Sequence, residues 1–342
     1  MQRSTRVLLL SLILVSAVSL FVGAGDVEPT ALLAGDADAW GLFIASRLPR
    51  LLAILCTGAG MSIAGLIMQQ LCANKFVSPT TGATIPAAQF GILLALLFMP
   101  DSTLWGRAAF AFGAAMAGTW MFVGFVLRTA MKNVMMVPLI GIMFGNVIMG
   151  LTNYLAFRYD MTQAMFSWTV GHFSLVMQGR YELVWLALPL IAIAFLYAGH
   201  FNIAGMGRDV SKSLGVSYKK VLFMGLSIAA MITASVVTVV GAISYIGLVV
   251  PNIVSLFKGD DLRGTLPDTA LAGALFVLLC DLIARKVIAP YELPIELIVG
   301  IVGSAVFVGL ILYRLRRGRR AVNLTNLREL FTPKAALKEG AH

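Results

Sequence analysis

Long apolar runs alternate with short polar interruptions along almost the whole chain. Most runs approach or exceed the roughly 18 residues that a helix needs to cross a bilayer. The third run contains Pro86 and Gln89, so we expect its first half to be broken, and the eighth is short and contains Pro251. The pattern predicts an all-α polytopic membrane protein with ten transmembrane helices, over 7–22, 48–71, 82–99, 108–127, 135–157, 183–198, 221–242, 246–257, 266–288 and 295–313.

The two ends of the chain are read from their flanking residues. Arg3 and Arg6 precede the first run, as they would in a cleaved signal peptide, but its length favours an uncleaved first span. A polar segment, 26–46, follows this run. Between the fifth and sixth runs, a short interfacial helix is expected within 158–181. Five arginines follow the tenth run, so we divide the chain into a transmembrane domain, 1–320, and a weakly ordered cytoplasmic tail, 321–342.

The distribution of charge sets the orientation. The chain has 342 residues, is 59% hydrophobic and carries a formal net charge of +10. Its basic residues lie mostly between apolar runs and accumulate on one side, which is the positive-inside pattern rather than a nucleic-acid interface. Both termini are therefore predicted to be cytoplasmic, together with Lys75, Arg128, Lys132, the 208–220 loop, Lys258 and Arg263. The outer side is left with Arg47, Arg50, Arg107, Arg158, Arg180, Arg285 and Lys286.

The stretch 201–220 is the longest polar interruption before the C-terminal tail. Its first part predicts one or two helical turns that end at Gly215 in a left-handed conformation. Ser217 is placed to cap a second short helix. Val210 and Leu214 share one face, because they lie four residues apart. The stretch is either a pair of helices that docks into a groove of a partner or an ordinary basic cytoplasmic loop.

The composition offers little for catalysis or for binding bare metal ions. Cys56, Cys72 and Cys280 all fall in apolar runs, which is typical of small buried hydrophobes. The histidines show no ligand spacing, and no catalytic triad or acid/base pair is evident. The middles of the spans are almost free of charged residues, which disfavours an ion-coupled secondary transporter. That class remains the alternative to an ATP-driven importer.

Five motifs together resemble the permease subunits of ATP-binding-cassette importers for vitamin B12 and ferric siderophores (FecCD-type). The order of the motifs matches that family and covers about 47–313. They are Arg47-Leu48-Pro49-Arg50 with Thr57–Gly60 and Gly65–Gln69; Asn74–Pro79; Gly207, Asp209 and Ser213–Val216; Gly241–Ile243 with Ile246–Pro251; and Asp281–Arg285 with Pro290 and Glu292–Pro294. The sequence departs from the family pattern at Asn252, Asp260–Arg263 and Glu296.

The resemblance implies a type II importer permease fold in the bacterial cytoplasmic (inner) membrane. It assigns the 201–220 stretch to two coupling helices that sit in a cleft on each ATPase subunit, which is a separate chain. The sequence has no Gly-x-x-x-x-Gly-Lys-Ser/Thr, since Ser211 precedes Lys212-Ser213. This chain is therefore not expected to be an enzyme or to bind a cofactor, and ATP and Mg would be used by the partner. The coupling residues implied are Gly207, Arg208, Asp209, Ser213, Leu214, Gly215 and Val216.

The resemblance also implies partners on the outer side. Arg47, Arg50 and Arg285 match positions that receive acidic residues of a periplasmic or lipid-anchored binding protein. We expect these arginines to be exposed, and clustered exposed guanidinium groups suit carboxylates physically. Arginines at a membrane edge also extend towards head groups without any protein partner. A second permease subunit is expected, for which a different sister chain is favoured over an identical copy.

The transported ligand is expected to be an intact ferric siderophore, because the chain lacks a cluster of carboxylates or histidines for bare iron. The segment around Gln69-Gln70 is most similar to permeases of the catecholate, anguibactin and enterochelin type. Vitamin B12 and haem remain alternative substrates. Polar or soft side chains within the spans are candidates for the substrate path, although each is also compatible with helix packing. They are Met68, Gln69, Gln70, Gln89, Asn146 and Asn153.

Overall fold

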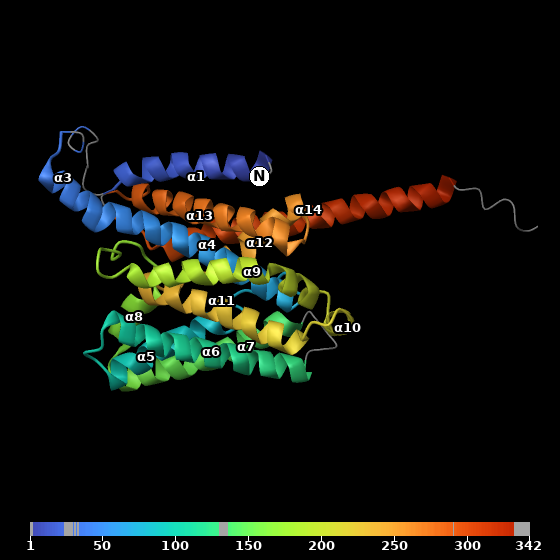
Figure 1. The fold of residues 1–342 in the computed structure, drawn as a ribbon, viewed down its shortest axis with the longest axis horizontal. Helices are drawn as coiled ribbons and strands as arrows, with labels where there is room; N and C mark the ends of the chain where they lie inside the picture. The colour runs from blue at the N-terminus through green and yellow to red at the C-terminus, as the bar shows by residue number, and fades with distance from the viewer. Residues whose placement is uncertain are drawn as a thin grey trace, which may run out of the picture.

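The computed structural model describes residues 3–23, 30, 32, 34–129, 136–289 and 291–331, with side chains in the last helix described up to Tyr313. Lys132, Pro290 and the tail from 332 to 342 lie outside these residues. The described chain forms a bundle whose long helices run roughly parallel to one another (Figure 1). The helices are α1 Arg3–Phe21, α3 Ala37–Leu42, α4 Leu48–Leu71, α5 Thr84–Phe98, α6 Leu104–Thr129, α7 Met136–Arg158, α8 Thr162–Thr169, α9 Ala187–Gly205, α10 Arg208–Ser213, α11 Tyr218–Val240, α12 Ile246–Lys258, α13 Leu262–Lys286 and α14 Ile295–Phe331.

Each of the ten predicted segments corresponds to a helix. Eight helical stretches of the described chain are long and apolar enough to cross a membrane, whereas α5 and α12 are shorter apolar helices. The short α12 agrees with the short eighth span that the sequence predicts. The expected break at Pro86 is wrong, however, because this proline lies in the first turn of a continuous α5, where no intrahelical N–H bond is lost. α8 is the short helix expected between the fifth and sixth spans.

Helix α4 forms the centre of the bundle, and most of its residues are buried. Its neighbours approach it backbone to backbone at glycines. A Cβ built on Gly65 would lie 1.9 Å from the carbonyl oxygen of Gly247 in α12, and one on Gly58 would lie 2.4 Å from that of Gly273 in α13. These small residues therefore set the helix separation. Gly113 and Gly150 have nothing within 4 Å of such a Cβ, so close packing does not explain every glycine.

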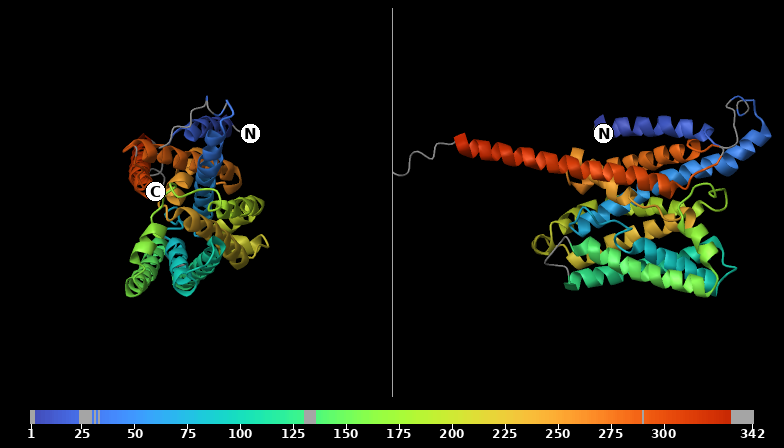
Figure 2. Two further views of the ribbon diagram at one scale, coloured as in Figure 1. Left: turned by 90° about the vertical axis from the view of Figure 1, so that its left-hand side faces the viewer. Right: turned by 180° about the vertical axis from the view of Figure 1, so that it is seen from behind.

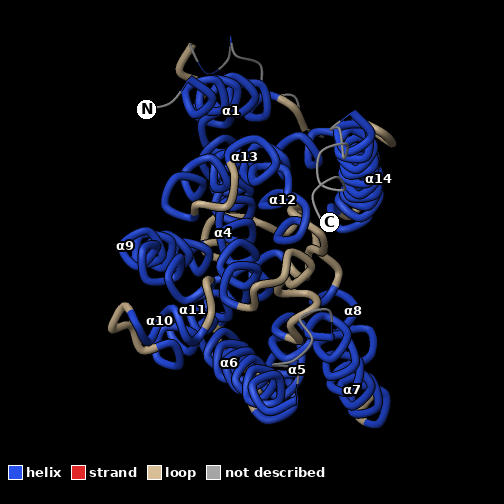
Figure 3. The backbone as a smooth tube through the Cα atoms, turned by 90° about the vertical axis from the view of Figure 1, so that its right-hand side faces the viewer, coloured by secondary structure: helices blue, strands red, loops and turns tan. Residues whose placement is uncertain are grey.

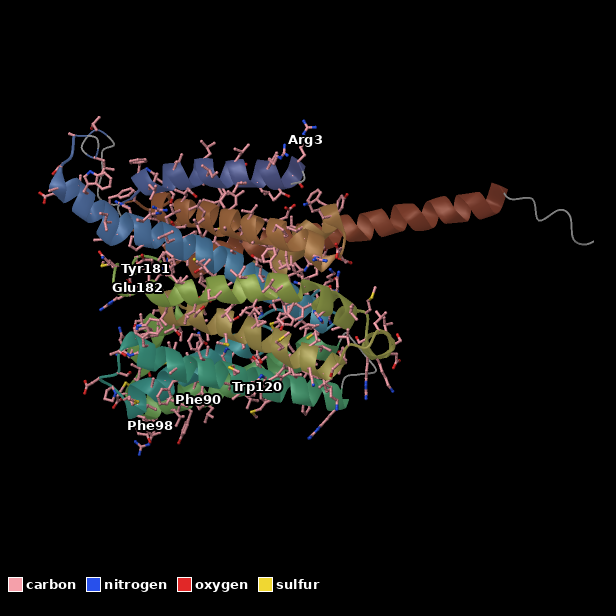
Figure 4. The ribbon with its side chains drawn as sticks, viewed as in Figure 1. Arg3, Phe90, Phe98, Trp120, Tyr181 and Glu182 are labelled. Atoms are coloured by element: carbon pink, nitrogen blue, oxygen red, sulfur yellow. The ribbon has the colours of Figure 1, made fainter. Side chains whose placement is uncertain are left out.

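The two ends of the bundle differ. α10 lies at the end where the chain begins, and α14 projects beyond the bundle there (Figures 1 and 2). Arg3 is at this end, whereas Tyr181 and Glu182 lie at the other (Figure 4). The helical backbone of α14 continues to Phe331, into the stretch that we expected to be a weakly ordered tail. The structure therefore separates the predicted coupling stretch from the outer loops by the length of the bundle.

The outer faces of several helices are apolar. Phe98, for example, is 73% exposed, and Trp120 is 39% exposed with its ring stacked on Phe223 (Figure 4). α7 and α14 lie at one side of the molecule, and each contacts few other helices (Figure 3). Exposed apolar surface of this extent indicates contact with lipid or with another protein, as expected for a multi-pass membrane protein.

Candidate functional site

The α10 turn, residues 207–216, reverses the direction of the chain between α9 and α11. Gly207, the N-cap of α10, has a φ of 103°, and Gly215, which follows α10, has a φ of 73°. The N–H of Val216 donates to the Ser211 carbonyl at 2.8 Å, and the N–H of Gly215 donates to the Lys212 carbonyl at 3.1 Å. This pair of bonds is a Schellman motif. It confirms the prediction that Gly215 is the left-handed residue after the helix.

Residues of α10 divide into an anchor and an exposed surface. Ser211 is buried, and its hydroxyl donates to the carbonyls of Gly207 at 2.7 Å and Ile203 at 3.2 Å, which fixes α10 against α9. Val210 and Leu214 are 40% and 58% exposed. Met206, which we did not predict as a site residue, follows α9 and is 68% exposed. Arg208, Asp209, Lys212 and Ser213 are also exposed. The turn thus presents apolar and charged groups to a partner.

Two details of the expected helix pair are wrong. The helix that follows Ser217 is not short, because α11 begins at Tyr218 and continues through the bundle to Val240. Ser217 has extended backbone geometry but makes no side-chain capping bond. The exposed unit is therefore one short helix, α10, together with the first turn of a long helix.

The outer arginines form a network with carboxylates of the same chain. Arg50 donates to Asp281 at 2.8 Å and to both carboxylate oxygens of Glu292 at 2.8 and 2.9 Å. Arg285 pairs with Asp281 one helical turn away, and it donates to the hydroxyl and carbonyl of Ser19 at 2.6 and 3.1 Å. This network ties together the ends of α1, α4 and α13 and the loop before α14.

The expectation that these arginines are exposed is wrong. Arg47, Arg50 and Arg285 are 8%, 8% and 5% exposed. Arg47 lies against the chain that follows α1 and donates to the Val22 carbonyl at 3.2 Å. Burial follows from pairing, since a guanidinium leaves water at acceptable cost only when carboxylates and carbonyls satisfy it. A role in docking remains a prediction.

Three of the candidate path residues lie in the helix interfaces. Met68 is 1% exposed within the core, and Gln69 is 3% exposed and donates to the Gly247 carbonyl at 3.0 Å. Gln70 donates to Asn202 at 3.4 Å, and Asn202 in turn contacts Asp261. These contacts join α4 to α12, α9 and the start of α13. The geometry gives Met68, Gln69 and Gln70 a packing role.

The other three candidates line two adjoining open cavities. One, of about 310 Å3, is lined by Gln89 of α5 and Asn146 of α7 and reaches the start of α14. The second, of about 290 Å3, is lined by Gln89 and Asn153. Met149 contributes to both cavities. The structure therefore brings these amides together along α5 and α7 and separates them from the amides of α4.

Glu296 lines the first cavity as well. In the sequence, Glu296 stands out only as a departure from the family pattern, and we did not predict it as a site residue. Its position in an apolar run after Glu292-Leu293-Pro294 was the available signal, because a carboxylate within a span tends to face a cavity or a partner.

Comparisons with known proteins show which family the chain resembles as a whole. The model of the FecCD transport family matches residues 9–314. The chain is 43% identical over 309 residues to the petrobactin import system permease protein of Bacillus subtilis (strain 168), covering 90% of this chain and 98% of that protein. It is 38% identical over 305 residues to the ferric-anguibactin transport system permease protein of Vibrio anguillarum (strain ATCC 68554 / 775), covering 89% and 97%.

A solved structure has the same fold. It is described as an inward-facing conformation of a putative metal-chelate type ABC transporter and superposes with a TM-score of 0.78. The match has 23% sequence identity and covers 90% of this chain and 98% of that chain. At this level of identity the likeness concerns the fold, which agrees with the architecture expected from the sequence.

Proposed function

Because the chain belongs to the FecCD transport family, we propose that it is the permease subunit of an importer that carries an intact ferric siderophore across the bacterial cytoplasmic membrane. The named functions of its relatives support the substrate class, since the petrobactin and ferric-anguibactin permeases align over nearly their whole length. The observation that carries the proposal is the cavity pair lined by Gln89, Asn146 and Asn153. Its described lining offers neutral hydrogen-bonding groups and one carboxylate, Glu296, which are too few ligands for bare iron.

The energy for transport comes from a separate ATPase in this proposal. Two ATPase subunits bind at the α10 end, where Val210 and Leu214 are exposed. A short helix with an exposed apolar face suits a groove on a partner. Closure of the ATPase pair is then transmitted through α10 into α9 and α11, which it joins. A second permease subunit, for which we favour a different sister chain, completes the path beside α7 and α14.

The binding protein docks at the opposite end in this proposal. Glu292 is the most exposed member of the arginine network, with 21% of its side chain accessible. A carboxylate of the binding protein would approach Arg50 at this edge and compete with Glu292. Such charge complementarity would orient the incoming protein and speed its association.

Charge reversal at Arg47 is expected to weaken docking of the chelate-loaded binding protein by about 10-fold or more. The affinity is to be measured on the complete importer in nanodiscs. Arg180→Glu is the matched control, because Arg180 is an exposed arginine in a loop whose Gln178 N–H contacts Ala45 close to Arg47. Equal affinity of the Arg47→Glu variant and the wild type would leave Arg47 with a purely structural role.

Uptake of labelled chelates tests the function as a whole. Cells with and without this gene are to be compared for ferric catecholates, ferric hydroxamates, haem and vitamin B12. We expect cells without the gene to lose ferric catecholate uptake alone. In cells with the gene, we expect this uptake to be sensitive to ATP depletion and resistant to uncouplers. Loss of vitamin B12 or haem uptake instead would reassign the substrate, and sensitivity to uncouplers with ATP present would indicate an ion-coupled transporter.

A further inference from the structure

The cavity between α5, α7 and α14 contains one charged side chain among the described residues that line it. Glu296 is that residue, and the polar groups around it are the amides of Gln89 and Asn146 and the hydroxyls of Thr80, Thr169 and Ser244. The remaining lining residues are glycine or apolar residues such as Ile85 and Ala242. The cavity is therefore lined by neutral polar and apolar groups together with a single carboxylate.

This carboxylate has no cation of its own. None of the ion pairs in the described part of the chain includes Glu296. Its side chain is half-buried, in the first turn of α14. The helix N-terminus stabilises a negative charge there by a modest amount. The carboxylate also has a hydrogen bond with the Gly171 backbone. A carboxylate without a cation inside a membrane protein is nevertheless costly and commonly has a functional counterpart.

Gln89 provides a second, independent observation. It is 7% exposed, and the hydrogen bonds found within the described residues include none from its side chain. Buried amides are normally satisfied by hydrogen bonds. Gln89 lines both adjoining cavities, so its amide faces space in which a ligand can supply the missing bonds. Gln89, whose amide makes no hydrogen bond among the described residues, thus faces the same cavity from α5 as Glu296 does from α14. The Glu296 carboxylate has a hydrogen bond with the Gly171 backbone but no cation within the described part of the chain.

Resting on the proposed function, we propose that Glu296 selects, among ferric chelates, those whose organic part carries a protonated amine. The ammonium group pairs with the Glu296 carboxylate, and Gln89 and Asn146 donate to or accept from neighbouring polar groups of the chelate. Anionic groups around the iron are repelled by the same carboxylate, so they face away from it. Specificity arises here both from an attraction and from a repulsion.

The test compares two chelates on the complete importer in proteoliposomes with its ATPase and binding protein. One is an iron(III) catecholate that bears a primary amine, and the other is the same chelate with the amine acetylated. The wild type is expected to take up the amine-bearing chelate faster. Glu296→Gln should reduce the ratio of the two initial rates by about 10-fold, because it removes a charge-assisted hydrogen bond. Glu296→Asp should retain part of the preference.

Asp101→Asn is the matched control, because Asp101 is an exposed carboxylate in the loop between α5 and α6 and outside the cavity. Its ratio should equal that of the wild type. A purely structural role of Glu296 would slow both chelates alike and leave the ratio unchanged, which would overturn the inference while the proposed function stands. Wild-type uptake of both chelates at equal rates would do the same. Uptake of neither chelate by the wild type would overturn the proposed function and the inference with it.

Discussion

Replacement of Leu214 by aspartate should abolish co-purification of the ATPase subunit and, with it, ATP-dependent uptake. Leu214 is 58% exposed at the end of α10, so a substitution there leaves the bundle interior intact. A buried apolar contact in a partner's groove would be replaced by an unpaired charge, which costs several kcal/mol in a desolvated interface. We expect at least about a 100-fold loss of complex, measured by pull-down from detergent-solubilised membranes.

Two glycine substitutions test whether the conformation of the α10 turn is required in addition to the apolar contact of Leu214. Gly215 adopts a φ of 73°, whereas Gly199 in α9 has ordinary helical geometry, and a Cβ added at either position would have no atoms within 4 Å. Gly215→Ala should strain the turn by roughly 1–2 kcal/mol and lower ATPase coupling. Gly199→Ala should not. Survival of the complex and of coupled ATPase activity in both Leu214→Asp and Gly215→Ala would show that the α10 turn is not the coupling element.

Sequence reasoning located the elements well because the bilayer fixes their length. A run that must satisfy its own backbone hydrogen bonds in lipid becomes a helix over its whole extent. Gly215 was predictable for a similarly local reason, since the left-handed position after a helix favours glycine. Features that depend on a few consecutive residues were therefore mostly predicted correctly. The exceptions are Pro86, which lies in the first turn of a continuous α5, and Ser217, whose backbone takes the capping geometry while its side chain makes no capping bond.

The partners of side chains from distant segments were not predictable in the same way. Arg50 meets Asp281 and Glu292 across sequence separations of 231 and 242 residues. Nothing near Arg50 in the sequence shows that its charge is neutralised, so the sequence favoured exposure. The amides present the same problem. Gln69 and Gln89 both lie in helices that are apolar on all sides, where no amphipathic stripe separates a packed face from a cavity face.

Asp281→Asn is expected to be the most destabilising single substitution in the outer network. The Asp281 side chain is 1% exposed and lies between Arg50 and Arg285. Removing its charge leaves Arg50 with Glu292 alone and Arg285 without a paired carboxylate among the described residues. Loss of one member of a buried ion pair typically costs roughly 3–5 kcal/mol. The measurement is the thermal unfolding midpoint of the purified protein in detergent.

The network also predicts an order among substitutions that remove the same charge. Glu292→Gln should lower the unfolding midpoint less than Asp281→Asn, because the Glu292 side chain is 21% exposed and contacts only Arg50 among the arginines of the network. Asp101→Asn should leave it unchanged, since that residue is exposed and outside the network. An Asp281→Asn midpoint equal to that of Asp101→Asn would mean that the arginines are not held by this carboxylate. Their side chains would then be available to an external partner, as the sequence alone suggested.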